Sequence, residues 1–213
     1  MAMRLLPERA HRRDADRAAG VRAFGRMVEY FHIPVLNRLL AVFAFFALPF
    51  ALYVSMFALF ADRRLGMTAE QTGYFLAFVG MLGIVWQGGL VGPLVKRVGE
   101  HAALVGGLVC AAVGLYGIAA VDVWWEMMVV ALPLSFGTAI TRPAITSLIT
   151  IAAPADRRGG VLGVTSAIES LSRVVAPIAG GWLIAFHPSW LGWVAGALGT
   201  LAVILAVGIQ RIR

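Results

Sequence analysis

Six long apolar runs, separated by short polar segments, dominate the pattern of this chain of 213 residues. A helix needs about 20 residues to cross the hydrocarbon core of a bilayer, and all six runs reach that length. The pattern therefore predicts six transmembrane helices. Their expected bounds are residues 35–61, 72–95, 102–121, 127–153, 161–185 and 191–210. Prolines inside these runs do not argue against helices, because neighbouring groups in a membrane protein satisfy the freed carbonyls.

The composition supports the same class of protein. Hydrophobic residues make up 60% of the chain and charged residues 14%, with a mean hydropathy of +0.84. Soluble globular domains are about 45–50% apolar and about 25% charged. The 24 glycines suit helices that pack closely in a membrane. Composition and pattern together predict an all-α polytopic membrane protein.

The basic residues between the runs indicate how the chain is oriented. Six spans place both termini on one side of the membrane, and 14 of the 18 Lys and Arg residues fall on that side. Only Arg63 and Arg64 fall on the other side, and the remaining two lie inside spans. Because cytoplasmic segments are enriched in Lys and Arg, we expect both termini in the cytoplasm and the protein in the plasma (inner) membrane. Since the charges follow the topology and form no single patch, membrane lipid rather than nucleic acid is the expected partner.

Residues 1–34 form a basic segment ahead of the six-helix region, residues 35–213. Apolar residues recur at three- and four-residue steps from Val21 to Phe31, with arginines between them. This spacing is typical of an amphipathic helix lying on an anionic leaflet. A solvated leader explains the composition equally well, so both interpretations stay open.

A faint internal repeat suggests how the six helices are organised. Residues 47–50 (ALPF) resemble residues 131–134 (ALPL), and residues 61–64 (ADRR) resemble residues 155–158 (ADRR). Two groups of three helices would place the ADRR copies on opposite faces of the membrane, as an inverted repeat requires. We therefore expect two three-helix inverted repeats.

Three charged residues lie inside the apolar runs: Arg142, Glu169 and Arg173. A charge at the bilayer centre costs about 2.5–3.5 kcal/mol on insertion scales, so such residues usually pair or line a polar path. Glu169 and Arg173 are four residues apart, which favours a pair on one helix, and Arg142 lies at a similar depth. One interpretation is a buried ion pair that fixes helix packing. The other is a polar element of a translocation path, to which Trp86 and Gln87 in the second span would contribute unless they only pack.

The segment between the second and third runs carries a motif. Residues 88–106 read GGLVGPLVKRVGEHAALVG, which resembles the loop signature of the major facilitator superfamily. Gly92, Arg97 and Gly99 match the signature, in which a glycine packs two helices together before a basic turn. We expect Gly99 to need a backbone conformation that only glycine adopts at low cost. Lys96 and Glu100 depart from its better-preserved copy.

A second stretch gives a more specific resemblance. Residues 142–181 look like the tenth and eleventh helices of drug- and tetracycline-efflux-type members of that superfamily. The matching positions are a cytoplasmic turn with two arginines, followed by Ser170, Leu171, Arg173, Pro177 and Gly180.

The resemblance implies the second half of a larger fold. Members of the superfamily have twelve helices in two six-helix bundles, with substrate held between them. It implies a secondary transporter, expected to be a proton-coupled exporter of a small molecule, that works with a missing first half or a second copy. We expect the sequence to be a fragment of such a protein. A membrane scaffold or accessory subunit without transport is the alternative.

The sequence carries no visible enzyme chemistry. It has no serine–histidine–acid set, glycine-rich phosphate loop or paired carboxylate, and no histidine has a spaced metal-ligating partner. We therefore expect no catalytic residue, no cofactor and no metal site.

Overall fold

The computed structural model describes residues 33–209, in which every regular element is helical. The expected amphipathic helix within residues 1–34 and the end of the sixth run at Gln210 lie outside these residues. Every other predicted boundary of the six runs is within four residues of a helix end. The elements are α2 (Pro34–Leu65), α3 (Ala69–Val85), η1 (Trp86–Val91), α4 (Gly92–Val98), α5 (Glu100–Ala120), α6 (Trp124–Ala152), α7 (Arg158–Phe186) and α8 (Trp190–Val207).

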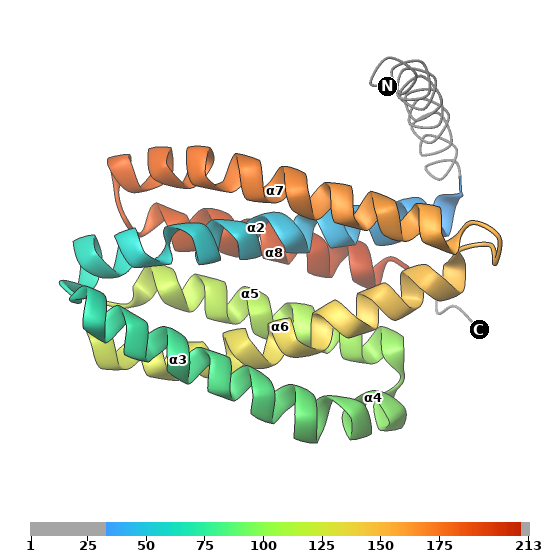
Figure 1. Ribbon diagram of the computed structural model, residues 1–213, viewed down its shortest axis with the longest axis horizontal. Coiled ribbons are helices and arrows are strands. Elements are labelled where there is room, and N and C mark those ends of the chain that lie inside the picture. Colours follow the sequence, from blue (N-terminus) through green and yellow to red (C-terminus); the bar gives the residue numbers. More distant parts are fainter. Residues whose placement is uncertain (1–32, 210–213) are drawn as a thin grey trace, which may run out of the picture.

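Six helical spans in the described residues are long and apolar enough to cross a membrane, counting α3, η1 and α4 as one. They run along a common axis, and the connections after α2, α5 and α7 lie at one end of the bundle (Figure 1). The start of α2, the α4–α5 and α6–α7 connections and the end of α8 lie at the other end (Figure 1). Both ends of the described chain are therefore on the same side.

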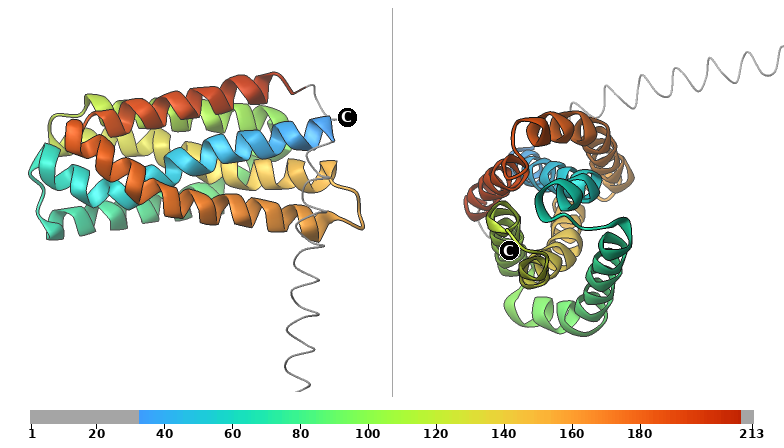
Figure 2. Two further views of the ribbon diagram at one scale, coloured as in Figure 1. Left: turned by 90° about the horizontal axis from the view of Figure 1, so that it is seen from above. Right: turned by 90° about the vertical axis from the view of Figure 1, so that its left-hand side faces the viewer.

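Helix packing follows the expected repeat. Helix α5 packs against α6 as α8 packs against α2, and α7 packs along α2 as α3 packs along α6. These pairs are equivalent if α2, α3–α4 and α5 correspond to α6, α7 and α8. The view along the bundle in Figure 2 shows α3 and α4 at its periphery.

The second span is not one regular α-helix, which the sequence pattern did not predict. Residues Trp86–Val91 form a π-helical turn that contains Gly88 and Gly89. Such turns are rare and occur often at functional sites. Because each inserts a residue into the helix, the π-turn changes which side chains α3 and α4 present to the bundle.

Gly99 alone separates α4 from α5. Its φ of 84° and ψ of 159° lie in a region that glycine adopts and other residues almost never do. The backbone requirement expected for Gly99 is confirmed. It brings two helices back against each other without a loop.

Glycines make the closest helix contacts in the bundle. A Cβ added at Gly137 on α6 would collide with the backbone of Ala111 on α5, and one at Gly114 on α5 would lie 2.6 Å from Leu134 Cβ. Gly192 and Gly196 play the same part between α8 and α5. Gly92 does not, because nothing lies within 4 Å of a Cβ built there. The expectation that Gly92 packs two helices of this bundle is therefore wrong.

Two large apolar clusters fill most of the bundle, and their fully buried residues are interrupted near its middle on α2, α6 and α7. One cluster uses the first part of α2 up to Ala47 and the last part of α6 from Ala144. The other begins at Leu52 on α2 and ends at Leu134 on α6. On α7 the same break separates Val164 from Ala176. The three intramembrane charges lie at this interruption.

Candidate functional site

Arg142 on α6 and Glu169 on α7 meet at the same depth in the bundle. Arg142 lies in the second half of α6, and Glu169 lies in the first half of α7, at a comparable distance from the connection between them. Because the two helices are antiparallel and this connection is short, these positions face each other. Arg142 Nη2 donates a hydrogen bond to Glu169 Oε1.

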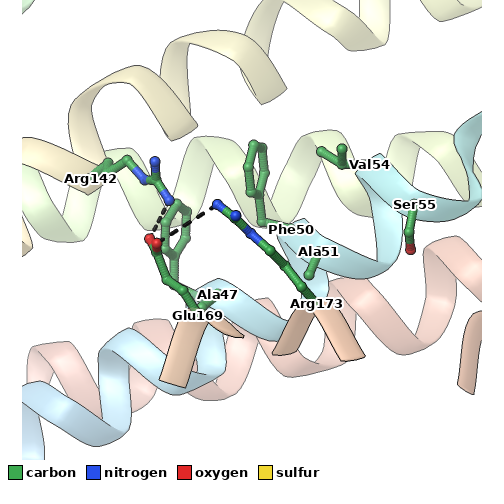
Figure 3. A pocket seen from close by; sticks show the side chains of 9 residues that line it. Ala47, Phe50, Ala51, Val54, Ser55, Arg142, Glu169 and Arg173 are labelled. Carbon is green, nitrogen blue, oxygen red and sulfur yellow. Dashed lines mark hydrogen bonds and ion pairs between the residues drawn. The ribbon is translucent and has the colours of Figure 1, made fainter. Parts of the chain in front are cut away.

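Arg173 approaches the same carboxylate from the next turn of α7. Its Nη2 lies 3.9 Å from Glu169 Oε2, at the limit of an ion pair. Figure 3 shows both guanidinium groups directed at the one carboxylate. The partner of Glu169 is thus mainly Arg142 on another helix, and the expected Glu169–Arg173 pair is the longer of the two contacts.

The three charges line a cavity of about 270 Å³. Its remaining wall is one face of α2, where Ala47, Ala51 and Ser55 are small and leave room beside the charges (Figure 3). Phe46 and Phe50 stack with ring centroids 6.0 Å apart and give this wall an aromatic surface. The complete lining is Phe46, Ala47, Phe50, Ala51, Val54, Ser55, Arg142, Glu169 and Arg173.

The ion pair is not a fully buried one. The side chain of Glu169 is 27% exposed, that of Arg142 49% and that of Arg173 73%. A buried pair that fixes helix packing would be closed off from its surroundings. This cluster opens toward the outside of the described bundle instead, although it does link α6 to α7.

A second cavity of about 270 Å³ lies beside the first. The two share Phe46, Phe50, Val54 and Arg142, so they form adjoining hollows around one ridge of α2. The second cavity adds polar side chains from three helices: Tyr53 of α2, Gln87 of the π-turn, and Ser135 and Thr138 of α6.

Gln87 and Trp86 differ in role, although they are neighbours in sequence. Gln87 lines the second cavity together with Arg142. Trp86 packs instead: its Nε1 donates a hydrogen bond to Ser135 Oγ at 3.1 Å, and its ring meets Phe136 edge-on. Within the described residues, Trp86 lines neither of the two cavities.

The serines near the charges do not contribute free hydroxyl groups. Ser166, Ser170 and Ser172 each donate a hydrogen bond to the carbonyl four residues earlier on α7, at 3.1, 2.9 and 2.8 Å. Their donors are therefore used within the helix.

Sequence reasoning missed the aromatic wall and Tyr53. Phe46, Phe50 and Tyr53 recur at four- and three-residue steps along one apolar run, a spacing that places them on one face of a helix. This spacing was visible in the sequence. It does not distinguish a helix face that lines a cavity from one that packs in the core, because both give the same spacing.

Gly92, Arg97 and Gly99 do not join the cavities. They lie at the α4–α5 end of the bundle, where Arg97 is exposed in the last turn of α4. The motif therefore marks a turn between helices and is separate from the charged site.

Comparison with protein families gives a match to the Major Facilitator Superfamily over residues 88–211, more than half of the chain. The matched region begins in the π-turn and includes Arg142, Glu169 and Arg173.

Two individual relatives are about 30% identical to the chain over most of its length. The chain is 29% identical to the Escherichia coli tetracycline resistance protein, class E, over 163 residues, which are 76% of the chain and 40% of that protein. It is 30% identical to solute carrier family 22 member 18 of Rattus norvegicus over 176 residues, 80% of the chain and 42% of the relative. The chain thus spans about two fifths of the length of the curated relatives it matches.

Proposed function

Because the chain belongs to the Major Facilitator Superfamily, we propose that it is a six-helix unit of a secondary transporter for a small organic molecule. We further propose that the groove formed by the two adjoining cavities is its part of the translocation path. Arg142, Glu169, Arg173 and Gln87 would be the polar residues of that path, with Phe46 and Phe50 as its apolar wall.

The observation that supports this proposal is the charged cluster at mid-depth. Charges inside membrane helices are costly and mark substrate or ion pathways. Here three of them line a hollow in the break between two apolar clusters. A chain selected only for stable packing would gain by filling this gap with apolar side chains.

Glu169 is our candidate for proton coupling. Its carboxylate is the shared acceptor for Arg142 of α6 and Arg173 of α7. Protonation would remove the negative charge that attracts both guanidinium groups, and would weaken the link between α6 and α7. These two helices make few other contacts. Proton uptake and helix movement would then be coupled at one side chain, as proton-driven efflux requires.

We propose that a second six-helix unit, either a first half or another copy of the chain, covers the open face. In the most apolar stretch of the α3–α4 span only 11% of the residues are buried, and in that of α7 28%, against 56% in α5. The curated relatives are more than twice as long as the matched region. Both observations fit a bundle that completes its path with a partner.

The charge distribution supports a plasma-membrane orientation with both termini in the cytoplasm. Within residues 33–209, the end that holds the start of α2 carries five Lys and Arg residues and two acids. The opposite end carries two arginines and four acids. The positive-inside rule favours the cytoplasm for the first of these ends.

Efflux measured in cells tests the proposed transport. The chain is expressed alone and together with a matching first-half bundle, in cells loaded with either a cationic or an anionic fluorescent dye. We expect energy-dependent efflux of one dye from cells in which two six-helix units assemble. In Glu169→Gln, efflux should lose its dependence on the proton gradient.

A matched variant separates transport from scaffolding. Arg63→Gln removes an exposed charge from the end of α2, outside the cavities, and should leave efflux unchanged. If the triple variant Arg142→Gln, Glu169→Gln, Arg173→Gln kept full efflux, the cluster would not belong to the path. If neither dye were exported, whether the chain is expressed alone or with the first-half bundle, a non-transporting scaffold would be the better description.

A further inference from the structure

The charged cavity carries an excess of positive charge. Two guanidinium groups, from Arg142 and Arg173, share the single carboxylate of Glu169. The other six acids of residues 33–209 lie at the ends of the bundle: Asp62, Glu70, Asp122 and Glu126 at one end, and Glu100 and Asp156 at the other. None of them lines the cavity. Within the described residues the site therefore holds a net charge of about one positive unit.

Arg173 is the group left without a full partner. Its contact with Glu169 is 3.9 Å long, whereas Arg142 makes a direct hydrogen bond to the same carboxylate. Arg173 is also the most exposed of the three, at 73% of its side chain. A guanidinium presents five N–H donors in a fixed fork that suits carboxylate, sulfonate or phosphate oxygens.

Lipid headgroups are poorly placed to supply the missing anion. Arg173 lies at the middle of α7, a helix of 29 residues. At about 1.5 Å per residue, each helix end is roughly 20 Å away. This distance exceeds the reach of an arginine side chain, so a lipid headgroup at either end cannot pair with Arg173.

The rest of the cavity surface suits an apolar body attached to the anionic group. Phe46 and Phe50 form a stacked wall shared by both hollows. In the second hollow Tyr53 is 5% exposed, and its hydroxyl has no hydrogen-bond partner within the described residues. A buried hydroxyl without a partner is costly, so Tyr53 is a polar group that the fold leaves unsatisfied beside this hollow.

We propose that this site binds a small organic anion, with its acidic group at Arg173 and Arg142 and its aromatic or apolar body against Phe46 and Phe50. The inference rests on the proposed translocation path and names its substrate class. It selects against organic cations, because a cation would meet an excess positive charge with no free carboxylate.

Equilibrium binding to the full chain in nanodiscs tests the substrate class apart from transport. The probes are three radiolabelled compounds with one ring system: naphthalene-2-sulfonate, its neutral sulfonamide and 2-naphthylmethylammonium. We expect the sulfonate to bind at least tenfold more tightly than either of the others. Binding is repeated with the assembled two-unit form, to include any acid that a partner contributes.

Charge variants identify the residues responsible. Arg173→Gln should weaken sulfonate binding about tenfold, and Arg173→Lys should restore most of the loss. Glu169→Gln should strengthen sulfonate binding, because it removes the competing carboxylate. A merely structural role for the cluster predicts weaker binding in Glu169→Gln as well. Arg63→Gln is the matched control and should bind as the parent does.

Several results would overturn the proposal. Tighter binding of the ammonium probe, equal binding of all three, no binding of any, or loss of sulfonate binding on assembly would each contradict an anion site. The proposed function and the substrate class fail separately. Efflux of a cationic dye with no anion binding would keep the transporter and reject the substrate class. Sulfonate binding without any transport would keep the substrate class and reject the transporter.

Discussion

Most glycines of α5, α6 and α8 occupy an environment opposite to that of the glycines of α3, η1 and α4. In the first group, Cβ atoms added at Gly107, Gly114, Gly137, Gly192 and Gly196 would all collide with a neighbouring helix. In the second group, Cβ atoms added at Gly73, Gly80, Gly83, Gly88, Gly89 and Gly92 would meet nothing within 4 Å. The same residue type lets helices approach in one region and leaves a bare surface in the other.

The difference separates the glycines that allow close packing inside the bundle from the glycines that lie on its outer surface. Without a hydrophobic driving force between helices in lipid, association depends on close packing of small residues. The first group satisfies that requirement inside the bundle. The second group meets it only if another helix approaches, which agrees with the proposed second six-helix unit.

The largest effect should come from adding bulk to the inner group. In Gly137→Leu the new side chain would collide with the backbone of α5 at Ala111 and Gly107. Overpacking typically costs about 1–3 kcal/mol and occasionally more, and backbone atoms cannot move aside like a flexible side chain. We expect most of the monodisperse protein to be lost on size exclusion in detergent.

The matched control for Gly137→Leu is Gly80→Leu, on an exposed face of α3. It should keep the yield of the parent. Equal losses of monodisperse protein in the two variants would show that the two glycine groups do not differ in their contribution to stability.

Two turn glycines should show a smaller, graded effect. Gly99→Ala places a side chain at φ 84°, ψ 159°, a region that costs about 1–3 kcal/mol. Gly66→Ala places one in the left-handed helical region at φ 61°, ψ 25°, which costs about 1–2 kcal/mol. Thermal unfolding in nanodiscs should rank Gly99→Ala as the less stable variant. Gly66→Asn should recover part of the loss and Gly99→Asn should not; the reverse order would contradict the backbone assignment.

Bulk at Gly92 should leave the stability of the chain alone almost unchanged, within about 0.5 kcal/mol, as at other exposed positions. The position is exposed and open. If a second unit packs on α3 and α4, Gly92→Leu should reduce cross-linking or co-purification of the two units. A variant that lost folded yield without a partner would show that α4 packs inside the bundle.

The ion pair at one end of the bundle should contribute little. Arg64 Nη2 lies 2.5 Å from Asp122 Oδ1 and joins the last turn of α2 to the α5–α6 connection, but the Asp122 side chain is 73% exposed. Exposed pairs contribute about 0.2–1 kcal/mol. A double-mutant cycle of Arg64→Gln and Asp122→Asn should give a coupling in that range that falls with added salt. A coupling well above that range would mean that this end is packed more tightly than its exposure indicates.

Hydropathy was sufficient to predict where the helices lie, but it did not predict the irregular turns within them. The second span was predicted as one run over residues 72–95, yet it contains a π-turn and ends near Gly99. An apolar run indicates burial in lipid, not the register of hydrogen bonds within the helix. The sequence also placed Glu169 with Arg173, because spacing along one helix is visible in a sequence. Arg142 is the closer partner, since antiparallel packing of α6 and α7 brings it to the same depth.

By itself, the sequence determined the class of protein, the six spans, the charged residues inside them and the turn at Gly99. Each depends on a local property: apolar length, the cost of a charge in hydrocarbon, or a backbone conformation open to glycine. Tertiary structure alone decided which glycines pack, which guanidinium is left over, and that Phe46 and Phe50 form a wall beside the charges. These features depend on which faces of the helices contact one another in the folded bundle. Residues far apart in the chain meet only in that folded state.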